Sequence, residues 1–270
     1  MRSCYRRLPL TCVLIVLVFC IPLGAQQRPL LTEDPRLIPE GRLVTETGFG
    51  YFDQVPFPIQ GVEGDLLSLI DGGLHFGLGS RAEFQITGVL RNYLWVREGG
   101  TGRRNDWGDG LISTKIAIVK ESANLPDISF RPTVLLPNAS NESLGKDGTD
   151  FFASLLIGKS VGAAYVFGNF GVGILDDAVT AAAQQDVMVY GLAALVPLSD
   201  RFRLAFEING LENPQSNPTP GGEDRAQTRL GIQLDALGMR WDLAATAGLT
   251  DLDHRAGVVF GFTKEFTLWR

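Results

Sequence analysis

Few residues in this chain have the types and spacing that chemistry needs. Its three cysteines, Cys4, Cys12 and Cys20, all lie in the first twenty residues, and His75 and His254 are its only histidines. Beyond residue 20 the chain therefore has no thiol nucleophile, no disulfide and no cysteine-ligated metal. Two histidines are also too few for a multi-histidine metal centre.

Lipid hydrolysis is the catalytic alternative that His75 raises. A hydrolase of this kind needs a serine beside a histidine, with a polar third group to orient the base. His75 falls near the middle of an expected strand, on a polar face with Asp71 and Gly73, and no serine pairs with it by pattern. We expect His75 to line an interior or a rim, and we predict no catalytic residue, no cofactor and no enzyme activity.

The expected loops hold two weaker candidates for ligand binding. His254 follows Asp251 and Asp253, and with Asp176-Asp177 these carboxylates offer the oxygen ligands that a divalent cation prefers. No loop has EF-hand spacing, so we favour a solvated acidic loop and predict no metal site. Gly99–Gly102 lacks the helix and lysine of a phosphate loop. The adjacent Arg103-Arg104 would suit lipopolysaccharide phosphates, although a solvated loop is the preferred interpretation.

The elements that must position these side chains are strands, because the recurrent pattern has a period of two. From Arg225 to Asp235, apolar Leu230 and Ile232 share one face, and polar Arg229 and Gln233 share the other. Helical periodicity is not sustained anywhere. Twelve strands are expected, at residues 42–53, 65–78, 83–94, 108–120, 128–137, 150–159, 164–175, 186–197, 202–210, 225–235, 240–249 and 256–266.

The connections between these strands alternate in length. Short ones at 79–82, 121–127, 160–163, 198–201 and 236–239 lie between longer ones at 54–64, 97–107, 138–149, 176–185, 211–224 and 250–255. An up-and-down antiparallel sheet with tight turns at one end and long loops at the other has this pattern. Transmembrane β-barrels have short periplasmic turns and longer external loops, so we predict an all-β, 12-stranded antiparallel transmembrane barrel.

A secreted β-sandwich or a dry-cored soluble barrel is the alternative architecture. Two features favour the membrane barrel: the apolar faces of seven well-registered strands carry no charge, and they accept small residues such as Gly88 and Ala245. Two residues fit poorly. Pro132 would interrupt a strand ladder, and Lys264 takes a lipid-facing position from which it must reach the interface.

The N-terminal residues read as an export signal. Arg2, Arg6 and Arg7 precede an apolar stretch at 12–23, and Ala25 offers a small residue before a cleavage point. We therefore expect a signal peptide at 1–25, a periplasmic lead or short plug at 26–41 and the barrel at 42–270. The full chain has 24 basic and 30 acidic residues. The expected signal peptide contains three arginines and no acidic residue, so the mature chain would have 21 basic and 30 acidic residues and a net charge of −9. This acidity argues against a nucleic-acid partner.

The charged faces of the strands point to a lumen if the barrel is correct. The expected lumen-lining residues are Asp71, His75, Glu83, Arg91, Asp109, Lys115, Arg131, Asp150, Glu207, Arg229 and Asp235. Side chains of opposite charge can pair with one another and fill the lumen, or they can line a water-filled passage. Inward glycines such as Gly48 and Gly231 remove bulk, which favours a passage; the alternative is that they only relieve strand crowding.

Short glycine-rich motifs give the mature chain a resemblance to a known family. They are Thr32-Glu33-Asp34-Pro35 before Gly41, Gly108-Asp109-Gly110 with Lys115, Leu136-Pro137-Asn138, Gly148-Thr149-Asp150, Gly168-Asn169 and Tyr190-Gly191-Leu192. With these motifs the chain resembles the outer-membrane proteins named for the meta pathway of phenol degradation. The resemblance implies a β-barrel transporter for small, often aromatic, solutes.

Three classes of function follow, in order of preference. The first is a passive channel in the bacterial outer membrane for small solutes, aromatic or hydrophobic ones among them, with lipid and solute as partners and both termini in the periplasm. The second is a structural or surface-interaction barrel filled by its own charges. The third is an outer-membrane lipid hydrolase. The pattern leaves the oligomeric state open.

Overall fold

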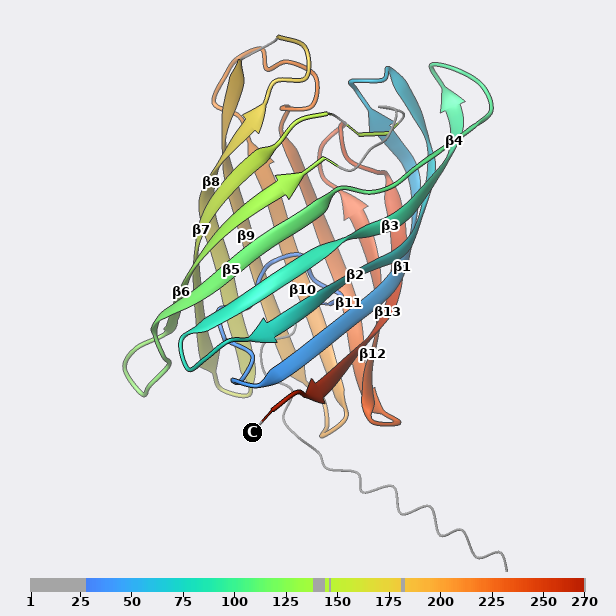
Figure 1. Ribbon diagram of the computed structural model, residues 1–270. Helices are drawn as coiled ribbons and strands as arrows, with labels where there is room; N and C mark the ends of the chain where they lie inside the picture. Colours follow the sequence, from blue (N-terminus) through green and yellow to red (C-terminus); the bar gives the residue numbers. More distant parts are fainter. Residues whose placement is uncertain (1–27, 138–143, 146, 181–182, 270) are drawn as a thin grey trace, which may run out of the picture.

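The computed structural model describes residues 28–137, 144–145, 147–180 and 183–269 (Figure 1). The expected signal peptide at 1–25 lies outside these residues. The described chain forms thirteen strands: β1 (Arg42–Phe57), β2 (Val62–Gly77), β3 (Ala82–Glu98), β4 (Arg103–Asp106), β5 (Gly110–Val119), β6 (Asp127–Leu136), β7 (Asp150–Val161), β8 (Ala164–Asp176), β9 (Gln184–Pro197), β10 (Phe202–Glu212), β11 (Arg225–Ala236), β12 (Met239–Gly248) and β13 (Ala256–Thr267).

Twelve of these strands close into one antiparallel barrel (Figure 1). Each pairs with its neighbours in sequence, β3 with β5 beyond the short β4, and β1 pairs with β13 to close the ring. Next to the closure, the Leu268 N–H donates to the carbonyl of Gly41 at 2.8 Å. The predicted 12-stranded antiparallel barrel is confirmed. Within the described residues, no helix is long and apolar enough to cross a membrane.

Two connections differ from the sequence prediction. The long connection expected at 54–64 is wrong, because β1 and β2 run on to a turn at 58–61. A bulge between Phe52 and Val55, where Gln54 has a φ of 52°, restores pairing so that Phe57 lies opposite Val62. The expected loop at 97–107 contains β4, which pairs with residues 92–95 in the C-terminal half of β3.

The two faces of the wall are inverted relative to those of a soluble protein, which buries its apolar side. Outward side chains are apolar and exposed, with Leu230 at 56% and Ile232 at 42%. Their inward neighbours are polar and buried, with Gln233 at 0% and Arg229 at 8%. The alternation predicted for this strand is therefore present, and the enclosed side of the wall is the polar one.

The two poorly fitting residues have physical explanations. Pro132 pairs with Ala153 of β7, whereas the register with β5 stops at Thr133 and resumes at Phe130, because proline has no N–H to donate. Lys264 is near the end of its strand, and its Nζ donates to the carbonyl of Gly238 in the β11–β12 turn at 2.6 Å. Its charge therefore reaches a polar group at the barrel rim.

Candidate functional site: the barrel lumen

Residues 28–38, here named the inner segment, lie inside the barrel without regular secondary structure (Figure 1). The segment forms hydrogen bonds or ion pairs with β1, β2, β3, β5, β6, β8, β10, β11, β12 and β13. Because its partners lie around almost the whole circumference, the segment spans the lumen from one wall to the other.

Arg28 attaches the first end of the inner segment to the β1–β2–β12–β13 side. Its guanidinium donates to the Asp71 carboxylate at 3.1 Å and to the Phe260 carbonyl at 3.3 Å, and it lies 3.6 Å from Asp242. Its backbone N–H points to Glu46 at 3.5 Å. Two carboxylates thus offset the desolvation of this buried cation.

Glu207 holds the next part of the inner segment against β10. Its carboxylate accepts the backbone N–H groups of Leu31 at 2.9 Å and of Thr32 at 2.7 Å. Arg229 lies 3.5 Å from the same carboxylate and donates to the Pro29 carbonyl at 2.8 Å. Charge-assisted bonds of this kind are stronger than neutral ones, so this contact fixes the backbone in place.

Glu33 is the centre of a buried ionic cluster on the opposite wall. Lys115 donates to its carboxylate at 2.7 Å, Arg131 lies 3.6 Å from it, and Gln85 donates to it at 2.9 Å. Burial disfavours the charged form of Glu33, but the neighbouring cations of Lys115 and Arg131 outweigh it and lower the pKa of Glu33 to about 2. With its amide oriented to satisfy both groups, Asn169 bonds to the backbone of Glu33.

The last part of the inner segment returns to the wall at β3, β6 and β8. Arg36 forms an ion pair with Asp34 at 2.5 Å, and its guanidinium stacks 3.9 Å from the ring centroid of Tyr165. The Ser129 hydroxyl donates to the Pro35 carbonyl at 2.6 Å. A small apolar core completes the packing, in which Leu30 meets Tyr165, Phe167, Ala193, Leu195 and Ala205.

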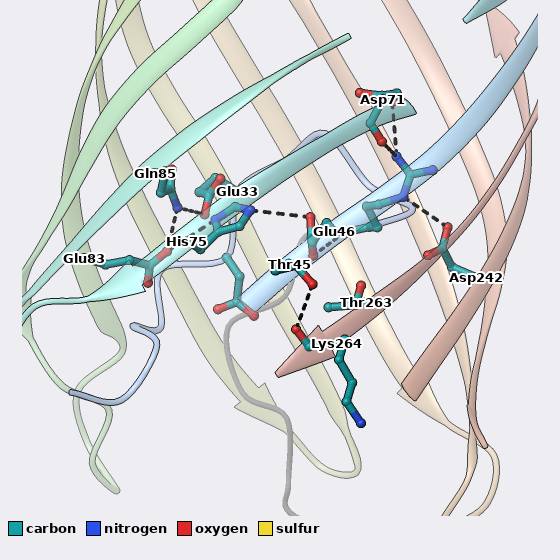
Figure 2. Close-up of polar contacts among 12 residues, drawn as sticks. Glu33, Thr45, Glu46, Asp71, His75, Glu83, Gln85, Asp242, Thr263 and Lys264 are labelled. Carbon is teal, nitrogen blue, oxygen red and sulfur yellow. Dashed lines mark hydrogen bonds and ion pairs between the residues drawn. The ribbon is translucent and has the colours of Figure 1, made fainter. Parts of the chain in front are cut away.

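His75 lies between two carboxylates on the inner wall. Its Nε2 is 3.6 Å from Glu46, and its Nδ1 is 3.6 Å from Glu83 (Figure 2). Glu83 also accepts the Ile38 N–H at 2.8 Å, so the histidine belongs to the network around the inner segment. This setting makes His75 part of an ionic cluster inside the barrel.

The structure brings most of the expected lumen-lining residues to the inner segment. Asp71, His75, Glu83, Lys115, Arg131, Glu207 and Arg229 contact it directly or through one neighbour. The other four bond elsewhere or lie between strands. Arg91 bonds to Asn105, Asp150 accepts the Asp176 N–H, Asp235 pairs with Arg203, and Asp109 lies between β4 and β5.

Sequence reasoning missed four central partners: Arg28, Glu33, Glu46 and Arg240. Glu46 and Arg240 form a buried pair at 3.4 Å; by strand alternation Glu46 shares a face with Gly48, which is expected inward, and Arg240 shares one with Asp242. Strand parity was therefore a signal for them. Arg28 and Glu33 lie in an irregular segment, where no periodicity indicates which way a side chain points.

Inward glycines make room for the inner segment. A Cβ at Gly48 would collide with the guanidinium of Arg28, and one at Gly231 would lie 2.9 Å from the ring of Pro29. A Cβ at Gly191 would lie 2.6 Å from Thr32 Oγ1. These positions permit a close approach of the inner segment, which neither sequence interpretation of the glycines had included.

Two cavities lie between the inner segment and the loops. The deep cavity, of about 230 Å³, is bounded by Leu31 and Thr32 and by the wall from β5 to β10. The outer cavity, of about 300 Å³, lies against residues 209–211, 225–227 and 252–254. Asn209 contributes to both cavities, so they adjoin at this residue.

His254 is held within the loop end of the barrel. Its Nε2 is 2.9 Å from Thr246 Oγ1, and its ring makes an edge contact with Phe52. Burial, together with the nearby cation of Arg229, lowers the pKa of His254. Among the residues that the structure describes, no group of three or more His, Cys, Asp or Glu side chains is arranged to hold a metal ion.

Comparisons with known proteins agree with this architecture. No protein-family model matches the sequence, and no curated protein matches it. The COG4313 outer membrane channel from Pseudomonas putida F1 has a TM-score of 0.66 at 11% identity, over 86% of this chain and 98% of that one. The NanC porin has a TM-score of 0.51 at 9% identity, over 82% and 97% of the two chains.

The translocator domain of the autotransporter NalP from Neisseria meningitidis is a third likeness. Its TM-score is 0.50 at 15% identity, over 83% of this chain and 88% of that one. At these identities the likeness concerns the fold alone. The chain is therefore similar in fold to an outer-membrane channel, a porin and an autotransporter translocator domain.

Proposed function

We propose that the protein is an outer-membrane channel for small solutes rather than an enzyme. It would be exported with a signal peptide at 1–25 and inserted with both termini in the periplasm. The long loops would then face outward, and the short turns at 120–126, 162–163 and 237–238 would face the periplasm, as in other barrels of this type.

The outward face supports insertion in a lipid bilayer. Exposed apolar side chains occur along the barrel wall, with Phe170 at 62% and Leu192 at 56% as examples. A soluble protein rarely exposes a contiguous apolar surface of this extent. Outer-membrane lipid is therefore the partner that this face fits.

The observation that carries a channel function is the polar inner wall with two adjoining cavities. Barrels that conduct have a polar lumen and an apolar exterior. The cavities lie on the loop side of the inner segment, so they form the outer part of a route across the barrel. The inner segment is the barrier on that route, and its displacement from the lumen would set the rate at which solutes pass.

The size of the cavities limits the solute. Both lie at or below the lower end of the roughly 300–1,000 Å³ that drug-sized ligands occupy. We therefore propose small solutes, with aromatic or hydrophobic molecules among them, as the family resemblance implies.

A sealed structural barrel is the second candidate function. The pairing of Glu207, Glu33 and Arg28 across the lumen favours it, because a dry interior must compensate its charges. The two candidates differ in one measurable property, which is solute flux.

Liposome swelling tests the channel directly. Mature protein, refolded and checked by the gel shift that folded barrels show after boiling, is reconstituted and exposed to small neutral solutes. Swelling that increases with protein content and falls with solute size supports the channel. Folded protein that leaves swelling at the level of empty liposomes contradicts it and favours the structural barrel.

A further inference from the structure

The deep cavity has the features of a binding site for one solute. Its walls are largely apolar, with Leu111, Phe152 and Val189 on the barrel and Leu31 on the inner segment. The polar groups among these walls come from Thr32, Arg131, Thr133, Ser154, Asn169 and Asn209. Ligand sites commonly combine an apolar lining with a small number of placed polar groups.

Two of these polar groups have buried atoms without a partner. Thr32 is 2% exposed, and its Oγ1 forms no hydrogen bond among the described residues. The same holds for Nδ2 of Asn209, a residue that also lines the cavity. An unsatisfied buried donor or acceptor costs about 1–3 kcal/mol, so each of these atoms has a reason to bond to an occupant.

The cation beside the cavity already has its counter-charge. Arg131 donates to Gln85 at 2.8 Å and lies 3.6 Å from the Glu33 carboxylate. A charged solute entering the cavity would lose water without gaining a free opposite charge, and burying an unpaired charge is strongly unfavourable. The cavity therefore selects against ions of either sign.

We propose that the deep cavity binds one small uncharged solute that has an apolar body and a hydroxyl or carbonyl oxygen. The oxygen accepts a hydrogen bond from Nδ2 of Asn209 and lies within reach of the Thr32 hydroxyl, while the body contacts Phe152 and Val189. This inference rests on the proposed function and extends it, because it places a recognition step on the loop side of the inner segment.

The route into this site passes Asn209. The outer cavity shares this residue and is bordered by Arg225, Gln227 and Asp253, which are polar or charged. A solute thus moves from a polar entrance to a more apolar site, and Asn209 lies at the boundary between the two.

Cyclohexanol, cyclohexanecarboxylate and cyclohexylammonium are suitable probes, since they share a ring and differ in charge. Binding to the full mature barrel in detergent is followed by ligand-observed saturation-transfer NMR. We expect saturable binding of cyclohexanol and at least tenfold weaker binding of both ions. Equal binding of either ion, or no saturable binding of cyclohexanol, would overturn the proposal.

Thr32→Val is the sharpest variant because it keeps the side-chain shape and the backbone bond to Glu207. Thr32→Val and Asn209→Leu should each weaken cyclohexanol binding roughly three- to tenfold, the effect of one hydrogen bond. The matched control is Thr45→Val, on the outer face. Unchanged affinity in both cavity variants, with folding verified by the boiling gel shift, would remove the site.

Binding and flux separate the two proposals. Binding is measured without a membrane, whereas the channel is tested by liposome swelling. Flux without cyclohexanol binding keeps the channel and removes this site. Binding that depends on Thr32, in a barrel without flux, keeps the site and removes the channel.

Discussion

The Glu207 carboxylate holds the backbone of the inner segment at two adjacent residues, because it accepts the N–H groups of Leu31 and Thr32 and faces Arg229. In Glu207→Ala, Arg229 stays buried without its partner, at a cost of about 3–5 kcal/mol. We expect the inner segment to detach more often and single-channel conductance to increase. Glu98→Ala, at an exposed position, is the control, and equal conductance in the two variants would argue against this role.

Gly48 tests whether close approach of the inner segment depends on a missing side chain. Gly48→Val places methyl groups where the Arg28 guanidinium lies, so we expect Arg28 to leave its site and conductance to rise. Gly110→Val is the matched control, since a Cβ there has no atom within 4 Å. If Gly48→Val conducts as the unmodified protein does, the glycine has no part in seating the segment.

The pKa of Glu33 predicts how the attachment of the inner segment to the barrel wall depends on pH. Its pKa is about 2 when attached, below the ordinary value of 4.5, so its contribution is complete above pH 4.5. This contribution is lost as pH falls from about 4.5 towards 2. Conductance should therefore rise as the pH falls from about 4.5 towards 2. Above pH 4.5, Glu33 should cause no change in conductance. A Glu33→Gln protein should lack the change, and an identical acid response in both proteins would exclude Glu33 as its source.

At the scale of residues, strand parity was the informative signal. It placed Glu83, Lys115 and Glu207 on the inner face, because successive strand residues alternate between faces. Parity could not reveal that Glu33 is their partner, since the inner segment has no periodic structure. The ionic cluster therefore depends on tertiary contacts that no local pattern contains.

At the scale of elements, the inner segment is a separate piece of chain docked on a rigid wall. The Cβ of Thr32 lies 3.3 Å from the position of a Cβ at Gly191, close to the roughly 3.5–4.5 Å found in disulfides. The proposed mature chain has no cysteine of its own, so a Thr32→Cys/Gly191→Cys pair would crosslink without competition.

This crosslink tests whether the inner segment must move for solutes to pass. Oxidation of the double variant should reduce liposome swelling, and reduction of the disulfide should restore it. The Thr32→Cys single variant, treated in the same way, controls for the reagents. Equal swelling before and after reduction, in protein shown to be crosslinked, would mean that solutes pass a stationary segment.

The strands themselves were largely predictable, and the exceptions have local causes. Alternation in residues 225–235 and 202–210 predicted β11 and β10 within two residues of their bounds. The ends of β1 and β2 were missed because the bulge at Gln54 shifts the alternation by one residue. Bulges and the short β4 depend on pairing with a neighbouring strand, which a pattern along one strand does not contain.

At the scale of the whole molecule, the barrel has an apolar exterior, a polar interior and a docked inner segment, and together these features support the proposed channel for small solutes. The exterior explains why such a barrel would reside in lipid, and the interior explains how a polar route could cross it. The inner segment then sets how much of that route is open.

Single-channel conductance of the refolded mature protein in a planar bilayer tests this claim most directly. We expect steady ohmic steps, small in the unmodified protein and larger in Glu207→Ala. Silence from both proteins, with folding verified by the boiling gel shift, would contradict a water-filled route through the barrel.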